Sequence, residues 1–333
     1  MLLRIFLAWI FVSNSMLVNA ADGEWSGYIA TEWRIFSDSP TDPVQHGDNT
    51  SLSAQAEYYR EWNAGKQSFR FTPFVRIDGR DNQRSHFDIR ELNWTTVHAK
   101  WELTTGIGKV FWGVTESQHL VDIINQTDLI ESTDGEEKLG QLMLKLNLAR
   151  DWGNIDLFVL PGFRERTFPS RTGRLRSQAA VAVNNAEYAS SQGRNHVDAA
   201  IRWSHSVGDW DVGLSHFSGT SRDPRFRVGL DKGRTVLIPI YETIDQTGLD
   251  LQATKDDWLW KLEVISRSGQ GERYTAATGG FGYSLYGIYE SAVDLGLIAE
   301  YLFDDRDELS ATPFEDDLFL GARLSFNDEA SSE

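Results

Sequence analysis

Histidines and acidic residues are the side chains of this sequence that could carry proton-transfer chemistry. The chain has seven histidines and no cysteine, which excludes thiolate catalysis and thiolate metal sites. His86 with Asp88, or His119 with Asp122, could each be drawn as an acid–base pair. The histidines show no paired metal-ligand spacing and no serine motif, and histidines beside aspartates are common on protein surfaces. The sequence therefore predicts a protein that is not an enzyme and that uses no cofactor and no metal.

Charged side chains of both signs alternate with apolar ones along most extended segments. If these segments close into a barrel, the charges face its lumen, where opposed charges create a transverse field that favours polar solutes. In the alternative interpretation, the same groups pair across neighbouring strands and merely fill a narrow barrel. The predicted pore-lining residues are Arg34, Glu57, Arg70, Arg76, Asp78, Lys145, Asp198, Arg202, Asp250, Lys261, Glu263 and Arg323.

A long polar loop between Trp112 and Lys138 contains a short apolar pattern at near-helical spacing, from Leu120 to Ile130. In one interpretation the apolar side of this segment packs on the inner wall of a barrel, and its polar side chains form a constriction. In the other, the loop covers the outer mouth, so the sequence leaves open whether loop 113–138 enters the lumen. The predicted constriction residues are Glu116, Asp122, Asn125 and Asp128.

An arginine-rich stretch, FRERTFPSRTGRLR, stands in a chain whose formal net charge is -17. Guanidinium groups suit phosphate and carboxylate, so this outer loop could collect an anionic solute or dock on the phosphates of lipopolysaccharide. Arg222, Arg225 and Arg227 in the next outer loop would extend the patch. The acidic balance predicts that nucleic acid is not a partner. The predicted anion patch comprises Arg164, Arg166, Arg171, Arg174 and Arg176.

The elements that position these side chains are extended segments of about ten residues, the length of a transmembrane β-strand. In the segment from Glu24 to Phe36, Ile29 and Trp33 share one face, while Glu32 and Arg34 share the other. Tight turns such as Asn63 to Lys66 alternate with long connections rich in Ser, Asp, Pro and Gly. A soluble β-sandwich would place polar residues outward, where this chain has Leu and Trp.

We therefore predict an all-β fold: a transmembrane antiparallel up-and-down β-barrel of about 14 strands, with short periplasmic turns and longer outer loops. One segment breaks the regular alternation. Phe87 and Ile89 conflict in phase with Leu92 and Trp94, which predicts a β-bulge between them.

Residues 1–20, MLLRIFLAWIFVSNSMLVNA, have an early cation at Arg4, an apolar run and small residues before a cut after Ala20. This pattern is typical of a secretory signal peptide. The predicted organisation is a signal peptide over residues 1–20, a barrel over residues 21–326 and a short polar tail over residues 327–333. The predicted location is the outer membrane of a Gram-negative bacterium, reached after export with cleavage of the signal peptide.

Two stretches resemble known outer-membrane proteins. The terminal GARLSF, with Leu324 and Phe326 at the third and fifth positions after Gly321, resembles the signal by which barrels are handed to their assembly machinery. Phe319 and the tail after Phe326 depart from that signal. The stretch from Lys100 to Glu131, with Arg90-Glu91-Leu92 before it, is similar to porin-like barrels of the alginate-export and phosphate-selective type. Gln126 stands there where that type usually has proline, and the strand count is lower.

This resemblance implies a channel-like role, and it does not identify the substrate. We expect an outer-membrane channel for passive diffusion of a small polar solute, with anionic solutes among the candidates. Its expected partners are outer-membrane lipid and lipopolysaccharide, the barrel-assembly machinery and the solute itself. The alternative is a plugged structural or docking barrel without an open pore. A carrier of apolar ligands would need an apolar inner wall, whereas the predicted lumen positions are mostly polar.

Overall fold

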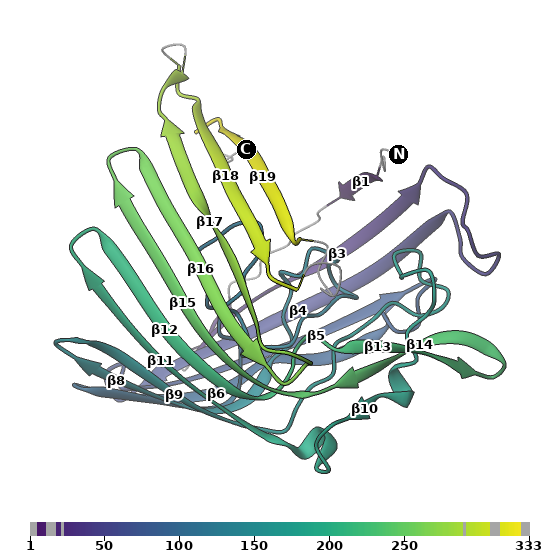
Figure 1. Cartoon of the computed structure of the whole chain (residues 1–333), viewed down its shortest axis with the longest axis horizontal. Coiled ribbons are helices and arrows are strands. Elements are labelled where there is room, and N and C mark those ends of the chain that lie inside the picture. Colours follow the sequence, from purple (N-terminus) through teal and green to yellow (C-terminus); the bar gives the residue numbers. More distant parts are fainter. Residues whose placement is uncertain (1–4, 11–17, 21–22, 289–290, 307–313, 328–333) are drawn as a thin grey trace.

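Antiparallel strands make up most of the computed structural model, which describes residues 5–10, 18–20, 23–288, 291–306 and 314–327. Sixteen strands form one rolled sheet, shown in Figure 1, and two of them, β1 (Ile5–Ile10) and β2 (Val18–Ala20), belong to the predicted signal peptide. The other fourteen confirm the predicted number. They are β3 (Gly23–Phe36), β4 (Asp48–Trp62), β5 (Gln67–Asp78), β6 (His86–His98), β7 (Trp101–Gly108), β8 (Gln141–Arg150), β9 (Gly153–Pro161), β11 (Val197–Val207), β12 (Trp210–Thr220), β15 (Thr243–Lys255), β16 (Trp258–Ser268), β17 (Tyr274–Leu285), β18 (Asp294–Asp304) and β19 (Asp316–Ser325).

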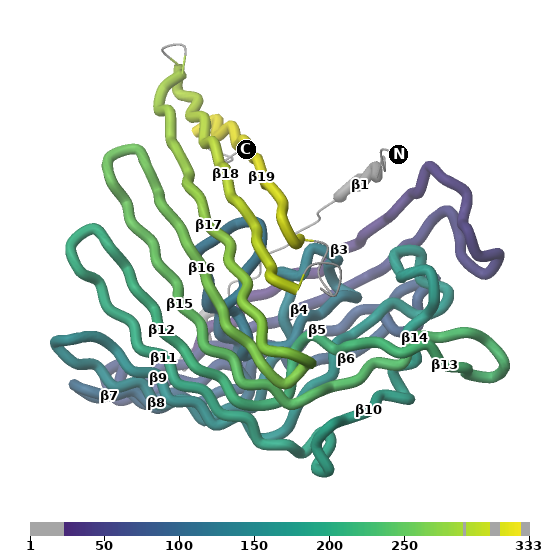
Figure 2. Tube along the Cα trace, viewed as in Figure 1, coloured from purple at the N-terminus to yellow at the C-terminus, as the bar shows by residue number. Residues whose placement is uncertain are grey.

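After β3, each of the fourteen strands pairs with the strand that precedes it in this series, as expected for an up-and-down barrel. The two outermost strands of this series, β3 and β19, are not paired with each other. The edge of β3 that faces away from β4 is occupied by β1 and β2, while β19 pairs with β18. Figure 2 shows the chain curling around an interior, with the sheet open between these two strands.

The outer surface of the sheet is apolar, as the alternation predicts. Ile29, Ile77, Leu318 and Leu320 are all more than 60% exposed, although each is a strand residue. Such side chains have no reason to face water, whereas they suit the hydrocarbon band of a membrane. The charged residues of opposite parity face the interior.

The predicted bulge lies in β6. The register between β5 and β6 shifts at Thr72/Pro73, so that Thr72 pairs with Glu91 and Pro73 with Ile89, and Arg90 is the extra residue. Arg90 is almost fully buried, and Glu91 contacts the inward-facing Arg70 at 3.6 Å. Two successive side chains therefore face the interior, which explains the phase conflict in the sequence.

The connections sort onto two ends. Tight turns join β4 to β5, β6 to β7, β8 to β9, β11 to β12 and β15 to β16 at one end, where the connection between β17 and β18 is longer. The opposite end carries the other connections, and the longest of them precede β8, β11 and β15. One of these longer segments contains a hairpin of β13 (Arg225–Asp231) and β14 (Arg234–Tyr241), which β10 (Glu187–Tyr188) extends to a three-stranded sheet. In the described ranges the helices are η1 (Val183–Asn185) and η2 (Gly193–Asn195), and neither could cross a membrane.

The predicted signal peptide and tail lie partly outside the described residues. Of the predicted tail, residues 328–333 lie outside, and Asn327 donates to the backbone carbonyl of Ala292 at 2.7 Å. Residues 5–10 and 18–20 form strands. The cut after Ala20 stays a prediction.

Candidate functional site: a loop folded into the barrel interior

The segment 109–140, called the inserted loop below, connects β7 to β8 and folds into the interior of the rolled sheet. Val121 and Ile124 are fully buried in one cluster with Phe158 and Phe217 of the inner wall. The aromatic ring of Trp112 packs edge-on against Phe158, with the ring centroids 5.6 Å apart. Of the two interpretations that the sequence leaves open, the structure places the loop inside.

The inner wall makes room for this loop with a glycine. A Cβ atom added to Gly248 of β15 would lie 2.9 Å from Oγ of Ser215 on the wall and 3.0 Å from Cγ1 of Val121 in the loop, so it would crowd both side chains. The resulting apolar cluster joins the loop to strands β8 to β17. The inner wall is thus more apolar than the sequence predicts, and the apolar part is covered by the loop itself.

Glu263 of β16 anchors the inserted loop to the inner wall. Its Oε1 atom accepts hydrogen bonds from the backbone N–H of Val114 at 2.7 Å and of Thr115 at 3.1 Å, and from the Thr115 hydroxyl at 2.8 Å. Its Oε2 atom accepts from the N–H of Val121 at 3.0 Å. Gly113 has a φ of 153°, and a Cβ atom added to it would lie 3.2 Å from Glu263 Oε1. A residue with a side chain would therefore crowd the carboxylate. The carboxylate is fully buried and satisfied by loop donors, so it does not face an open pore.

Glu300 of β18 is a second anchor of the same kind. It accepts from the N–H groups of Glu116 at 2.9 Å and Ser117 at 2.8 Å, and from the Ser117 hydroxyl at 2.6 Å. A buried carboxylate with several N–H donors has its charge stabilised without a cation. Two adjacent turns of the loop are therefore each bound to one carboxylate of the far wall.

Asn125 closes the base of the inserted loop. Its side-chain amide donates to the carbonyls of Gly108 and Leu139, both at 2.9 Å, and accepts from the N–H of Val110 at 2.8 Å. The two ends of the loop are joined through this one buried side chain. Asn125, predicted as a constriction residue, instead determines the loop's fold.

Asp122 and Asp128 are also buried in the loop rather than exposed in a pore. Asp122 lies 3.1 Å from Lys138 Nζ, and Asp128 accepts from the Thr167 hydroxyl at 2.7 Å and contacts Arg90 at 3.2 Å. Burial raises the pKa of both carboxyl groups, although these cations act in the other direction. Of the four predicted constriction residues, Glu116 is the one whose carboxylate is well exposed.

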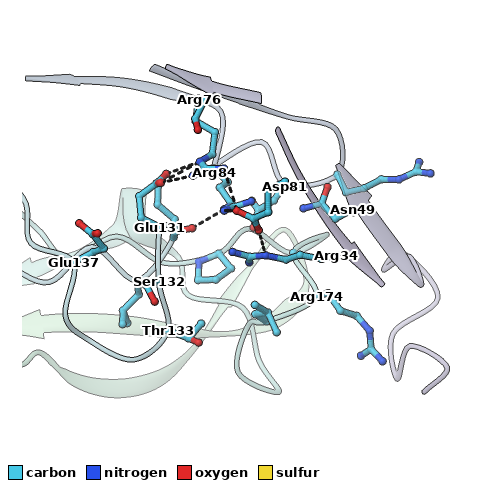
Figure 3. Close-up of a pocket in the computed structure, with 18 of the residues that line it drawn as sticks. Arg34, Asn49, Arg76, Asp81, Arg84, Glu131, Ser132, Thr133, Glu137 and Arg174 are labelled. Carbon is cyan, nitrogen blue, oxygen red and sulfur yellow. Dashed lines mark hydrogen bonds and ion pairs between the residues drawn. The ribbon is translucent and has the colours of Figure 1, made fainter. Parts of the chain in front are cut away.

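A cavity of about 740 Å³ lies between the inserted loop and the wall formed by β3 to β5 (Figure 3). On the wall side, Arg76 donates to Glu131 of the loop at 2.8 and 3.0 Å and to Glu32 at 3.3 Å. Arg84 donates to Glu32 at 2.8 Å and to Asp78 at 3.0 Å. The Arg76–Glu131 pair fixes the loop against the wall, and the buried carboxylates neutralise the charges of Arg76 and Arg84.

The charges that remain accessible in this cavity are mainly acidic. The side chains of Glu136 and Glu137 are 56% and 51% exposed, and Asp48 and Asp134 are also exposed. Among the arginines that line the cavity, Arg80 is 43% exposed and lies 3.6 Å from Asp48, Arg174 is half-buried, and Arg34 is 16% exposed and contacts Glu32. The loop carboxylates Asp134, Glu136 and Glu137 are not among the residues predicted from the sequence, although the run DGEE at 134–137 indicates an exposed acidic turn.

A smaller cavity of about 300 Å³ lies on the other side of the loop, against β16 to β19. Glu116, Lys261 and Arg323 line it, and Lys261 Nζ donates to Glu116 at 2.5 Å. This hydrogen bond lowers the pKa of the Glu116 carboxyl group, helped by the charges of Lys261 and Arg323. Arg323, predicted as pore-lining, thus belongs to the interior.

The other predicted pore-lining residues face the interior in ion pairs. Across strands, Arg202 and Asp250 form two hydrogen bonds at 2.7 and 2.8 Å. Pairing between strands, the alternative interpretation of the sequence, accounts for this pair and for Glu57–Arg70 and Lys145–Asp156. Arg76, Asp78, Asp198, Lys261 and Glu263 instead bind residues of the loops. The remaining pairs are Glu57–Arg70 at 3.5 Å, Lys145–Asp156 at 3.4 Å and Asp198–Arg222 at 2.6 Å.

The predicted anion patch is paired within the chain. Arg164 contacts Asp88 at 2.9 Å and Arg166 contacts Asp223 at 2.5 Å, both across to other elements. Arg222, expected to extend the patch outward, is buried and donates to the carbonyl of Ile124. The others are bound to one nearby loop: Arg171 and Arg176 contact Asp42 at 3.8 and 2.8 Å, and Arg174 donates to the carbonyl of Asp38 at 2.8 Å. Anion binding by these arginines stays a prediction.

Neither histidine pair drawn from the sequence is formed. His86 lies 3.7 Å from Glu131, while Asp88 is bound by Arg164, and His119 lies 3.2 Å from Glu136. Over the described ranges, no group of three or more His, Asp and Glu side chains is placed to hold a metal ion.

Comparisons with known proteins concern the fold. No family model and no curated protein matches the chain. Among solved structures, the in-vitro folded trimer form of OmpT, an outer membrane protein of Vibrio cholerae, is 12% identical with a TM-score of 0.47, over 91% of this chain and 83% of that one. Its loop L8 deletion mutant is 11% identical with a TM-score of 0.49, over 90% and 86%. A porin is 10% identical with a TM-score of 0.32, over 89% and 98%.

At these identities nothing about solute or role carries over. The strand order, the apolar outer surface and the loop inside the sheet decide the architecture from the chain itself. The fold is that of a porin-like antiparallel up-and-down β-barrel. The finer resemblance to the alginate-export and phosphate-selective type stays a prediction.

Proposed function

We propose that this chain is an outer-membrane channel for the passive diffusion of a small polar solute. The observation that supports it is the charged cavity of about 740 Å³ between the inserted loop and the β3–β5 wall. A loop that merely filled the barrel would pack against this wall as it packs against β8 to β17. Instead, Glu131 reaches across to Arg76, and space lined by polar side chains remains beside the contact.

The channel requires a closed barrel, and we propose that closure follows removal of residues 1–20. β1 and β2 pair with the edge of β3 that a closing strand would use, and β19 has a free edge within the described residues. Pairing of β19 with β3 would leave no unsatisfied backbone groups at membrane depth. The location in a Gram-negative outer membrane, with assembly by the barrel machinery, is part of the same proposal.

The preferred solute is neutral or cationic rather than anionic. The guanidinium groups of Arg76 and Arg84 are buried in ion pairs, and the exposed Arg80 has Asp48 beside it, whereas Glu136 and Glu137 are half exposed in the cavity. Exposed carboxylate groups along a pore attract cations and repel anions. The anionic solutes considered from the sequence are therefore the less favoured class.

Planar-bilayer recording under a salt gradient tests the proposal. The protein used is the chain without residues 1–20, the predicted signal peptide, purified and refolded. We expect discrete conductance steps and a reversal potential that indicates preference for cations. In the double variant Glu136→Gln, Glu137→Gln, that preference should decrease. The matched control is Asp256→Asn, Asp257→Asn, which removes the same charge from the tight turn between β15 and β16, away from the cavity.

A correctly folded protein without any conductance would overturn the channel and favour the alternative, a plugged barrel. That alternative draws on the apolar cluster that binds the loop to the wall. A channel whose reversal potential is the same in the cavity variant and the control would contradict the permeation path along this cavity. Under both proposals the chain is not an enzyme, and its outer loops contact lipopolysaccharide.

A further inference from the structure

The hairpin outside the barrel has an apolar strand edge that is uncovered in the described part of the chain. β13 pairs with β14 on one side, and the order β10-β14-β13 places it at the edge of its sheet. The hairpin projects from the end that carries the long connections, as Figure 1 shows. Phe226, Val228 and Leu230 on β13 are 43%, 70% and 73% exposed. Such an edge is a template for pairing with another strand, and natural proteins usually protect it.

The turn of the hairpin determines which backbone groups face this edge. Lys232 and Gly233, with φ of 49° and 76°, form a two-residue turn between the paired residues Asp231 and Arg234. In such a type I′ turn the carbonyl of Asp231 accepts from the N–H of Arg234, so the polar backbone groups of Asp231 point toward β14. This direction alternates along an antiparallel strand. The N–H and carbonyl groups of Phe226, Val228 and Leu230 therefore point to the free edge.

We propose that this edge pairs with the same edge of a second copy of the chain, antiparallel and centred on Val228. Val228 then lies opposite Val228 of the second copy, and Phe226 lies opposite Leu230. All three residues have their backbone groups on the free edge, so each exchanges both of its hydrogen bonds with the opposite residue. Their side chains share one face and continue the apolar surface across the two copies.

The charges of β13 select this register. With Val228 at the centre, Arg225 lies opposite Asp231 of the second copy, at the positions between the hydrogen-bonded pairs where side chains are closest. Because the contact is two-fold symmetric, this attraction occurs twice. Centring the pair on Phe226 instead would place Arg225 opposite Arg227, which already bind Glu242 and Glu187 of their own chain, and would bring no acidic side chain opposite an arginine. The register centred on Val228 is therefore the one that adds an attraction between the two copies.

The absence of cysteine from the chain gives a direct test. A single cysteine in Val228→Cys lies opposite its own counterpart, so mild oxidation of the folded full-length protein should give a disulfide-linked dimer. Thr235→Cys on β14, which is also exposed, is the matched control and should stay monomeric. Equal dimer yields from the two variants would reflect random collisions and overturn the proposal. A monomeric Val228→Cys protein whose thiol resists a maleimide would place another occupant on the edge, which also overturns it.

Proline provides a second, thiol-free measurement. Val228→Pro removes an N–H that points to the free edge, so the hairpin keeps its bonds to β14 while edge pairing is blocked. Sedimentation of the wild-type protein in detergent should show a dimer that is lost in Val228→Pro. A monomeric wild type, or a dimer that survives the proline, would overturn the proposal. Neither result depends on conductance, so the channel and the dimer can fail separately.

Discussion

Replacing Glu263 with glutamine is expected to loosen the inserted loop without removing it. The carboxylate accepts three hydrogen bonds at Oε1 and one, from the N–H of Val121, at Oε2. In its best orientation the amide of Glu263→Gln keeps its oxygen toward Val114 and Thr115. Its NH₂ group then meets the N–H of Val121, so one charge-assisted bond is lost and two donors oppose each other.

The magnitude follows from the number of bonds affected. Losing one hydrogen bond to a charged group costs about 1.5–3 kcal/mol, which lowers the ratio of inserted to withdrawn loop about ten- to hundredfold. Glu263→Ala would leave the N–H groups of Val114, Thr115 and Val121 without this acceptor, whereas the Thr115 hydroxyl would keep the carbonyl of Gln118, and the change should cost more. A loop that withdraws part of the time should give larger conductance steps and more frequent transitions between levels.

Single-channel recording measures both quantities, with folding checked by circular dichroism. The matched control is Glu57→Gln, a lumen-facing carboxylate whose contact is Arg70 on the neighbouring strand. The control should retain the level transitions of the wild type. If Glu263→Gln folds and its conductance and transitions equal those of the wild type, Glu263 does not hold the loop and the reasoning is refuted.

Three further predictions concern the same loop. Asn125→Ala removes the bonds that join the loop ends and should lower the free energy of unfolding in urea by about 2–4 kcal/mol, as expected for buried groups left without partners; an effect below that of an exposed substitution would contradict it. Because its hydrogen bond to Lys261 lowers the pKa of Glu116 below 4.5, this contact stabilises the loop fully above pH 4.5 and is lost as the pH falls through the lowered pKa. Transitions between conductance levels should therefore become more frequent at acid pH, and Glu116→Gln should abolish this pH dependence. An unchanged pH profile in the variant would exclude Glu116 as the titrating group. Gly248→Val should clash with Val121 and cost about 1–3 kcal/mol, measured by the same urea titration against Gly47→Ala, which has open space around it.

The strands were predictable because their signal is local. Alternation with a period of two shows which side of each strand faces outward, and the phase conflict at Phe87 and Leu92 revealed the bulge that Arg90 occupies. The position of the inserted loop was not decided by its own residues. Its apolar side chains suit an inner wall, but the cover over an outer mouth would have used the same pattern.

The anchors of the loop could not be predicted, because their partners are backbone groups far away in sequence. Glu263 binds N–H groups more than 140 residues before it, and nothing in residue type marks a backbone donor. The sequence therefore identified Glu263 as an interior charge but not as an anchor. Asp122 and Asn125 were noticed for their chemistry, whereas their burial makes them part of the loop's own fold.

The inserted loop also connects the two sides of the open sheet. Through Glu131 it is bound to Arg76 of β5, near the N-terminal edge, and through Ser117 to Glu300 of β18, near the C-terminal edge. A segment bound at both places draws β18, and with it β19, toward β3. We therefore expect loop insertion and barrel closure to stabilise each other, since each limits the positions that the other can adopt. On this basis, a substitution that removes the hydrogen bonds of Glu300 to the loop, such as Glu300→Ala, should slow the formation of the closed barrel as well as loosen the loop.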